Sequence, residues 1–380
     1  MTTLFDLPTP SLVLDRSRLE RNCRRMAEKA ARHGVDLRPH LKTAKCAEVA
    51  RIATRGCFGG VTVSTLREAE YFVEHGFRDV TYAVGIAPNK FAGVAALQRR
   101  GAIVSILLDS VAMALEAARF ADADGQTLRV FIEIDPGYHR AGIQPADPAL
   151  LEIARALASS AKVELRGVLA HGGHSYAAKG IKAVRAAAEE ERASLVHAAE
   201  RLRAAGFACP VVSGGSTPGA CLAEKFEGLT EIRPGNYTFF DVMQAGIGAC
   251  LLDDIAVFVA ASVIGHKPEF NRALIDAGAL ALSKDFGADD AMPGAGYGLI
   301  CELESGARIE GVRVGNMSQE HGWLSMMDEH AAFPYERLPI GAMVRVLPGH
   351  SCLTAAAYDR YYVIDGGVEI VDEWERVNGW

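Results

Sequence analysis

Residues 103–125 read IVSILLDSVAMALEAARFADADG. The stretch opens with a nearly unbroken run of Val, Ile and Leu, which is typical of a strand that is covered on both faces. It continues with a longer segment of helical period that ends at a glycine. Residues 128–135, LRVFIEID, are strand-like again. A strand, a helix and a second strand in this order predict a parallel sheet.

The same alternation continues on both sides of this stretch. A long helix is expected from about residue 181 to 206. About eight strand–helix units fit a closed β/α barrel, and a doubly wound open sheet is the alternative. The number of units and the chain length favour the barrel. The strand-like segments are residues 11–15, 36–42, 60–65, 79–84, 103–109, 128–135, 163–171, 209–215 and 230–240.

The pattern changes after about residue 248, where strand-like segments are separated by Gly, Asp and Pro turns and few long helices occur. This region predicts a mostly antiparallel β domain. We therefore expect a β/α barrel over residues 18–247 and a β domain over residues 248–380 together with residues 1–17. The strand-like segments here are residues 254–266, 272–282, 297–305, 307–316, 343–350 and 361–374.

Composition and charge exclude several classes of protein. The chain has 380 residues and a formal net charge of −7, without a dense run of Lys and Arg, so nucleic acid and anionic membranes are not expected as partners. No apolar stretch reaches the ~18 residues that a membrane span needs, and the first residues show no secretion signal. The eight cysteines are scattered without a C-x-x-C pair, which indicates reduced thiols and a cytoplasmic protein.

Residues 38–45, RPHLKTAK, place two lysines at the end of a strand-like segment. In a β/α barrel the working groups lie at the C-terminal ends of the strands. A partly desolvated lysine amine at such a position forms a Schiff base with a carbonyl compound. The alternative is that Lys42 and Lys45 are solvated loop lysines. The residues at the other strand ends favour the chemical interpretation.

Other strand ends carry further polar side chains. Residues 211–220, VVSGGSTPGA, hold two glycines before Ser216 and Thr217 at an expected helix start. This arrangement binds phosphate, but it also fits a tight turn with an N-cap serine. The next strand end, IRPGNYTFFD, is the usual second part of a barrel phosphate site. Two more strand ends carry Tyr138, His139 and Arg140, and His171, His174 and Tyr176.

The β domain has its own chemical motif, PGHSC at residues 348–352. His350 and Cys352 flank one residue at a strand-like spacing, so both side chains are expected on one face. Imidazole nitrogen and thiolate sulfur suit Zn²⁺, although a core histidine beside a buried cysteine is the alternative. Glu320 and His321 in MSQEHGW are further candidates for groups that support the metal or face the substrate.

Together these motifs resemble the pyridoxal-phosphate (PLP) enzymes built on the alanine-racemase-type barrel, and within them the D-serine dehydratases and D-threonine aldolases. The resemblance covers nearly the whole chain. The segments that carry it are TPSLVLD, RPHLKTAK, TVSTLREAE, GYHRAGI, SGGSTP, IRPGNYTFFD, SQEHG and GHSC.

The resemblance implies that Lys42 carries PLP as a Schiff base, with His40 beside it, while Lys45 receives no role. Arg140 is implied to hold the cofactor or the network at the barrel mouth, with a structural ion pair to a strand-end carboxylate as the alternative. Tyr176 is implied to contact the ring, unless it only packs at the rim. The residues implied to hold the phosphate are Gly215, Ser216, Thr217 and Tyr237.

The metal motif separates two branches of this family. The aldolases have His-x-Asp there and the dehydratases have His-x-Cys, as in His350-Ser351-Cys352 of this chain. The run SYAA after AHGGH also differs from the aldolases. SQEHG and the C-terminal WERVNGW are similar to the subgroup of D-serine and D-threo-3-hydroxyaspartate dehydratases.

The resemblance thus implies a PLP- and zinc-dependent dehydratase, in which another divalent metal would also serve. D-Serine, D-threonine or D-threo-3-hydroxyaspartate would give an oxo acid and ammonia, with Lys42 as general base for the Cα proton. The sequence does not choose among these substrates. Retro-aldol cleavage, amino-acid racemisation and a non-catalytic PLP-binding role are the alternatives. A homodimer is also implied.

Overall fold

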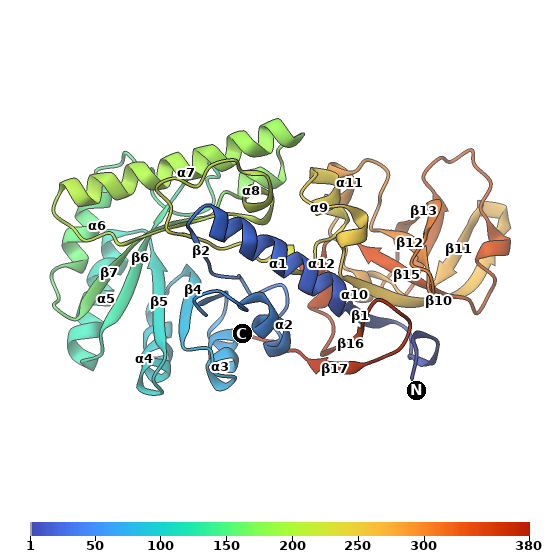
Figure 1. The fold of residues 1–380 in the computed structure, drawn as a ribbon, viewed down its shortest axis with the longest axis horizontal. Coiled ribbons are helices and arrows are strands. Elements are labelled where there is room, and N and C mark those ends of the chain that lie inside the picture. Colours follow the sequence, from blue (N-terminus) through green and yellow to red (C-terminus); the bar gives the residue numbers. More distant parts are fainter. Residues whose placement is uncertain (1) are drawn as a thin grey trace. The chain divides into compact units, whose positions relative to one another are not determined.

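The computed structural model describes residues 2–380, which form two units (Figure 1). Residues 24–235 with 377–380 are called the barrel unit, and residues up to 23 with 236–376 are called the β unit. These limits differ from the divisions expected at residues 18 and 247. Helix α1 (Arg16–Arg32) runs without a break across the first division. Shortly before the expected division at residue 247, Met243 N–H donates a hydrogen bond to Gly349 O at 3.2 Å. This bond ties the residues around Met243 to the β unit.

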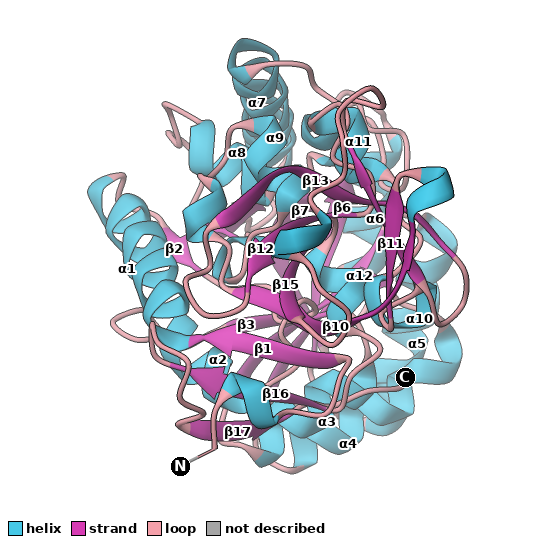
Figure 2. Ribbon diagram, turned by 90° about the vertical axis from the view of Figure 1, so that its right-hand side faces the viewer, coloured by secondary structure: helices cyan, strands magenta, loops and turns pink. Residues whose placement is uncertain are grey.

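The barrel unit is built around an eight-stranded parallel sheet in the order β2-β9-β8-β7-β6-β5-β4-β3. Strands of both units are drawn in magenta and helices in cyan in Figure 2. A parallel bridge between His40 and Thr62 joins the two outermost strands, so the sheet closes on itself. The predicted closed barrel is confirmed. Its strands are β2 (Asp36–Leu37), β3 (Val61–Val63), β4 (Asp79–Gly85), β5 (Ile103–Leu108), β6 (Leu128–Ile134), β7 (Val163–Ala170), β8 (Val211–Gly214) and β9 (Glu231–Ile232).

Helices follow the strands of the barrel as the alternation predicts. The long helix expected from about residue 181 is α7 (Ile181–Ala204). The others are α2 (Ala47–Ala53), α3 (Leu66–Glu74), α4 (Phe91–Arg99), α5 (Val111–Asp124), α6 (Ala149–Leu157) and α8 (Thr217–Leu222), with the short 3-10 helices η2 (Pro88–Lys90) and η3 (Gly173–Tyr176).

The stretch that suggested the fold shows how local chemistry sets these elements. Strands β5 and β6 pair in parallel, with Ile106 opposite Val130. Between them α5 begins at Ser110, whose hydroxyl accepts a hydrogen bond from Met113 N–H at 3.3 Å. The helix ends at Gly125, whose φ of +80° is strained for residues with a side chain.

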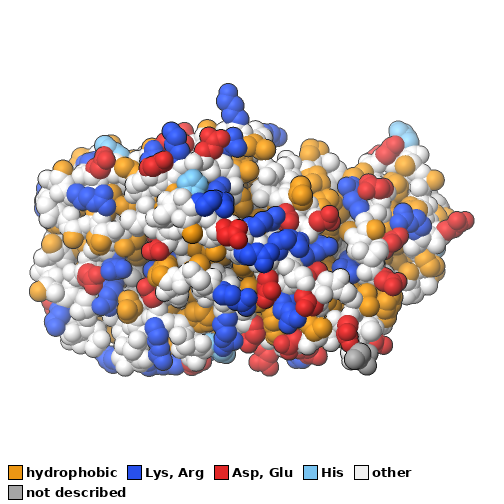
Figure 3. Space-filling view, viewed as in Figure 1, with side chains coloured by type: hydrophobic (Ala, Val, Ile, Leu, Met, Phe, Trp, Pro, Cys, Tyr) orange, Lys and Arg blue, Asp and Glu red, His pale blue; other side chains and the backbone are white. Residues whose placement is uncertain are grey.

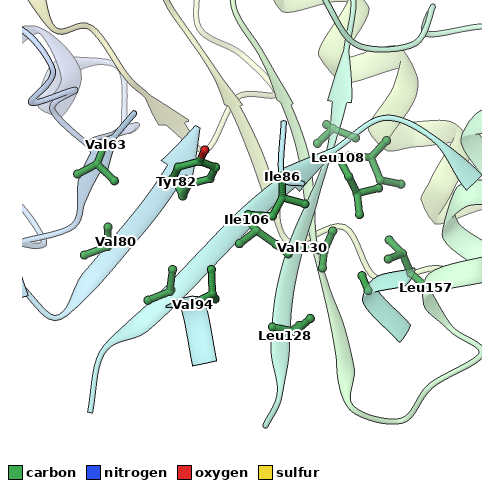
Figure 4. Packing of buried hydrophobic residues seen from close by; sticks show 14 of the residues in the cluster. Val63, Val80, Tyr82, Ile86, Val94, Ile106, Leu108, Leu128, Val130 and Leu157 are labelled. Carbon is green, nitrogen blue, oxygen red and sulfur yellow. The ribbon is translucent and has the colours of Figure 1, made fainter. Parts of the chain in front are cut away.

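The core of the barrel unit is a cluster of aliphatic side chains from its strands and helices (Figure 4). Val80, Ile106 and Val130 are fully buried, and burial of each such side chain is worth ~1.5–3 kcal/mol. Tyr82 is equally buried, and Lys90 Nζ donates to its hydroxyl at 2.7 Å. The phenol is therefore buried without losing its hydrogen bond.

The β unit holds a nine-stranded, mostly antiparallel sheet in the order β11-β14-β13-β12-β15-β10-β1-β16-β17. Strands β10 and β11 also pair, so the part of the sheet from β11 to β10 forms a closed barrel. The strands of the whole nine-stranded sheet are β1 (Ser11–Asp15), β10 (Val257–Lys267), β11 (Arg272–Ile275), β12 (Gly298–Glu302), β13 (Arg308–Met317), β14 (Gly322–Met326), β15 (Met343–Pro348), β16 (Arg360–Ile364) and β17 (Asp372–Glu375).

Residues 11–15 have the local pattern of a barrel strand and lie within residues 1–17, which are expected in the β domain. They form β1, which pairs with β10 and β16 of the β unit. Strand β14 was not expected, because its residues adjoin the polar motif around His321. The helices are α9 (Val242–Ile247), α10 (Ala279–Leu282), α11 (Gly287–Ala291) and α12 (Ser351–Ala355), with 3-10 helices η1 (Leu4–Asp6), η4 (Asn236–Thr238), η5 (Leu252–Asp254), η6 (Pro268–Phe270) and η7 (Tyr335–Arg337).

Over residues 2–380, no helix combines the length and the apolar character that crossing a membrane requires. Acidic and basic side chains are interspersed on the face drawn in Figure 3. Within residues 2–380, none of the eight cysteines forms a disulfide bond.

Candidate active site and metal site

Lys42 lies at the C-terminal end of the first barrel strand, as predicted. The chain continues from β2 to His40, and Leu41 N–H then donates to Thr62 O at 2.8 Å. A turn follows, closed by a 2.8 Å hydrogen bond from Lys45 N–H to Leu41 O. Lys42 is in this turn and is exposed. The amine is therefore presented by a turn that is fixed at both of its ends.

Two histidines lie in the electrostatic field of Lys42. Burial lowers the pKa of His40 well below its ordinary value, and the positive charges of Lys42 and Arg233 lower it further. The pKa of His171, at the end of β7, is lowered by burial and by Lys42 in the same way. Arg140 also acts on both rings. The structure thus brings together predicted residues from three strand ends, with both imidazoles neutral at pH 7.

We expect the stability of the cofactor-free protein to fall below about pH 6.5. His171 is neutral in the folded chain but takes up a proton when the chain unfolds, so the unfolded state binds more protons as the pH drops. Each such histidine lowers the free energy of unfolding by up to about 1.4 kcal/mol per pH unit. Urea unfolding between pH 7 and pH 5 should show a shallower pH dependence for His171→Gln than for the wild type. Equal slopes would contradict this explanation.

A buried arginine, which the sequence analysis did not single out, lies beside these groups. Arg233 donates to Ser213 Oγ at 2.5 Å and to the carbonyl of Ala170. Ser213 donates in turn to Glu231 Oε1 at 2.5 Å. Burial lowers the pKa of Arg233. The network joins the ends of β7, β8 and β9, and only the fold reveals it.

Aromatic rings surround His171. The rings of Tyr138 and Tyr176 have centroids 6.4 and 6.2 Å from that of His171. The guanidinium carbon of Arg140 is 5.7 Å from the centroid of Tyr138. Gly173 permits this packing, because a Cβ there would lie 2.2 Å from the Tyr138 ring. Arg140 also lowers the pKa of Glu133, which burial raises. Arg140 thus lies beside the Tyr138 ring and acts electrostatically on the strand-end carboxylate of Glu133.

The glycine turn after β8 is held by a carboxylate from α7. Glu191 Oε1 accepts hydrogen bonds from Gly172 N–H at 2.8 Å and from Gly215 N–H at 2.9 Å. Gly215 has a φ of +96°, so it contributes its backbone conformation while its N–H is already bonded. Ser216 caps α8 through a 3.1 Å hydrogen bond from Gly219 N–H. The buried Glu191 thus links the turns after β7 and β8.

The other two residues expected to bind phosphate are also buried. Thr217 is the first residue of α8. Tyr237 belongs to the β unit, where it lies in η4. The chemistry of the barrel unit fits PLP: the positive charges of Lys42, Arg140 and Arg233 all act on His171, so this region carries an amine and cations that favour a phosphorylated ligand.

The His-x-Cys motif is not in a strand. Strand β15 ends at Pro348, and His350 is the N-cap residue of α12, so the expected strand spacing is wrong. The two side chains nevertheless meet. Burial lowers the pKa of His350, but hydrogen bonds with Asp285 and Cys352 outweigh it and raise the pKa to about 11. A helix start replaces the strand and still brings nitrogen and sulfur together.

Asp285 is a functional candidate that the sequence did not reveal. Its Oδ2 lies 2.5 Å from His350 Nδ1, and this hydrogen bond lowers the pKa of Asp285. When Nδ1 of a histidine is hydrogen-bonded to a carboxylate, its other ring nitrogen, Nε2, is available to bind a metal ion. Asp285 is 65 residues from His350 in the sequence, so no local spacing indicates the pair.

Buried polar groups also surround Cys352. Asn236 Nδ2 donates to Cys352 Sγ at 3.6 Å and to Asp241 Oδ2 at 2.7 Å. Asp241 accepts Ser351 N–H at 3.0 Å, which fixes the start of α12. Within residues 2–380, no group of three or more His, Cys, Asp or Glu side chains is arranged to hold a metal ion. The donor atoms that meet here, an imidazole nitrogen and a cysteine sulfur, are of the kinds that bind Zn²⁺.

His321 is not brought to this pair by any contact. It lies exposed between β13 and β14, and its backbone packs against Gly278, where a Cβ would lie 2.5 Å from His321 N. In the part of the chain that the structure describes, its imidazole makes no hydrogen bond or ion pair. Its substrate-facing role remains a prediction.

Comparison with known proteins gives two family matches. Residues 14–242 match the N-terminal domain of alanine racemase, and residues 256–364 match a putative serine dehydratase domain. The chain is 43% identical to D-threo-3-hydroxyaspartate dehydratase of Delftia sp. (strain HT23), over 100% of this chain and 99% of the relative. It is 31% identical to D-serine dehydratase of Dictyostelium discoideum, with 99% and 98% covered. It is also 31% identical to D-threonine aldolase of Arthrobacter sp., with 98% and 93% covered.

Solved structures agree with these matches. The Delftia dehydratase has a TM-score of 0.96 to this chain at 42% identity, with both chains fully covered. A variant of that enzyme with a cysteine replaced by alanine, in a metal-free form, has the same score.

Proposed function

Because the chain belongs to the alanine-racemase-type family that carries a serine dehydratase domain, we propose that it is a PLP-dependent dehydratase of a D-3-hydroxy amino acid. The products are an oxo acid and ammonia. The named relatives are lyases, and both dehydratases and aldolases occur among them. The choice of a dehydratase rests on Cys352, which contacts His350. The resemblance places a carboxylate, and not a cysteine, at this second position of the motif in aldolases.

The residues of the barrel mouth would hold PLP through Lys42, with His40, Arg140 and Tyr176 around it. When bound, PLP supplies an electron sink for the charge that develops at Cα. Lys42 Nζ takes the Cα proton as general base from its place at the strand end. The neutral imidazoles leave Lys42 as the basic group. In the barrel unit, Ser216 and Thr217 would hold the phosphate, and Gly215 shapes the turn that carries them.

His350 Nε2 and Cys352 Sγ would hold a divalent metal ion, and their nitrogen and sulfur atoms favour Zn²⁺ over Mg²⁺. The metal supplies a Lewis acid for the departing 3-hydroxyl group. Asp285 orients the imidazole, and Asn236 donates to the sulfur. The hydroxyl is a poor leaving group, so this arrangement suits elimination.

One assay separates the alternatives. D-threo-3-Hydroxyaspartate, D-serine and D-threonine should be offered, and ammonia, aldehyde and the L-isomer measured together. We expect ammonia with an equal amount of oxo acid, first from D-threo-3-hydroxyaspartate because of the full-length relative. Aldehyde with glycine would favour the aldolase, and the L-isomer alone would favour a racemase.

We expect Asp285→Asn to weaken zinc binding by roughly 10–100-fold, as loss of a carboxylate behind a metal-ligating histidine does. The variant keeps the shape of the side chain but not the charge that orients His350. Zinc affinity should be measured by competition with a chelator. Asp290→Asn is the matched control, since Asp290 is exposed on α11. Equal affinity of Asp285→Asn and wild type would contradict the role of Asp285.

We also propose a homodimer as the active form, on the strength of the family resemblance. Exposed apolar side chains of the β unit near its motif, Phe286 and Leu353, are suited to contact with a second chain. Sedimentation at micromolar concentration would show a dimer. A fully active monomer would contradict the proposal.

A further inference from the structure

The second lysine of RPHLKTAK is anchored through its backbone on both sides. Lys45 N–H donates to Leu41 O at 2.8 Å and closes the turn that carries Lys42. Lys45 O accepts a hydrogen bond from Val377 N–H at 2.8 Å. The φ of Lys45 is +50°, in the left-handed region that residues with a side chain seldom adopt.

The side chain of Lys45 provides a third anchor. Its Nζ lies 3.5 Å from Glu68 Oε1, and the two side chains are only 19% and 1% exposed. Across residues 2–380, no other cation lies within ion-pair distance of Glu68. The partner is itself rigid, because Glu68 Oε2 accepts Ser64 N–H at 2.8 Å and Glu68 N–H donates to Thr65 Oγ1 at 3.0 Å. Lys45 is thus tied to the first turn of α3.

These ties act on a residue whose backbone conformation is unfavourable by itself. Left-handed conformations persist where the surroundings hold them, and they gather at functional sites. Within the turn, Leu41, Thr43 and Ala44 are buried, and the Lys42 side chain is exposed. The amine of Lys42 is the group that the turn presents, three residues before the anchor.

We propose that Lys45 is a positioning residue, which holds the turn from Leu41 to Lys45 so that Lys42 Nζ meets the aldehyde of PLP. The inference rests on the proposed function, in which Lys42 bonds the cofactor. In this step the Lys42 amine and the aldehyde form a C=N bond and release water. Lys45 takes no part in it. The two lysines of the motif therefore have different tasks.

The test compares two ligands that differ only where Lys42 acts. PLP bonds to a lysine, whereas pyridoxamine 5′-phosphate has an amine in place of the aldehyde and cannot. For Lys45→Met we expect the dissociation constant of PLP to rise roughly tenfold, the scale of coupling within one contact network, with that of pyridoxamine 5′-phosphate unchanged. Lys45→Arg should restore PLP binding. Arg67→Met, which breaks an exposed ion pair on the same helix, is the control.

Each outcome is decisive. Equal weakening of both ligands, with a lower unfolding temperature, would assign Lys45 to fold stability and overturn the inference. Unchanged PLP binding would also overturn it while leaving the proposed function intact. Absence of lysine-bound PLP in the wild type would overturn the proposed function, and this inference with it. If Lys45→Met does not fold, Glu68→Gln breaks the same ion pair. The affinities of this variant for PLP and for pyridoxamine 5′-phosphate are then measured, with the same expected results.

Discussion

Lys42→Ala is expected to abolish ammonia release, with a loss on the order of a thousandfold or more, because the cofactor bond and the general base disappear together. The fold should remain, since the Lys42 side chain is exposed. The measurements are kcat for ammonia and the visible absorbance of lysine-bound PLP.

Borohydride reduction of the wild type followed by peptide mass analysis locates the bond independently. The modified peptide should carry PLP on Lys42. Modification of Lys45 would show that the assignment is wrong. Lys225→Ala removes another exposed lysine and serves as the control.

Cys352→Ala is expected to remove the metal ion and to slow elimination by more than about a hundredfold, since even groups behind the ligands change metal sites by about 10–100-fold. Exchange of the Cα proton with solvent should survive, because Lys42 performs it. Metal content, ammonia release and deuterium uptake at Cα should be measured on one preparation.

Chelation of the wild type should have the same effect, and Zn²⁺ should restore activity better than Mg²⁺. Cys57→Ala is the matched control, because Cys57 is a free thiol in the barrel unit. Full dehydratase activity in a metal-free protein would contradict the metal role. The pair would then be core packing.

The sequence was sufficient where short-range patterns decide the structure. The period of residues 103–125 predicted a strand and a helix, and both occur as β5 and α5. Lys42 could be placed at a strand end for the same reason. Residues 11–15 have the same local pattern as a barrel strand, yet pairing with β10 puts them in the β unit. Local pattern does not determine which distant strand is the partner.

The supporting residues of the sites could not be predicted, because they come from far along the chain. Asp285 reaches His350 over 65 residues, and Glu191 reaches Gly172 over 19. An isolated carboxylate in a sequence carries no sign of the group that it will meet in three dimensions. The spacing argument for His350 and Cys352 failed in its geometry, since a helix begins between them.

The bridge between His40 and Thr62 closes the barrel only two residues before Lys42. Opening of this seam would therefore displace the turn that carries Lys42. A ligand that binds only when the seam is closed would stabilise the closed state by mass action. The amide hydrogens of Leu41 and Thr62, which bridge the seam, should then exchange with solvent more slowly in the loaded protein than in the cofactor-free one.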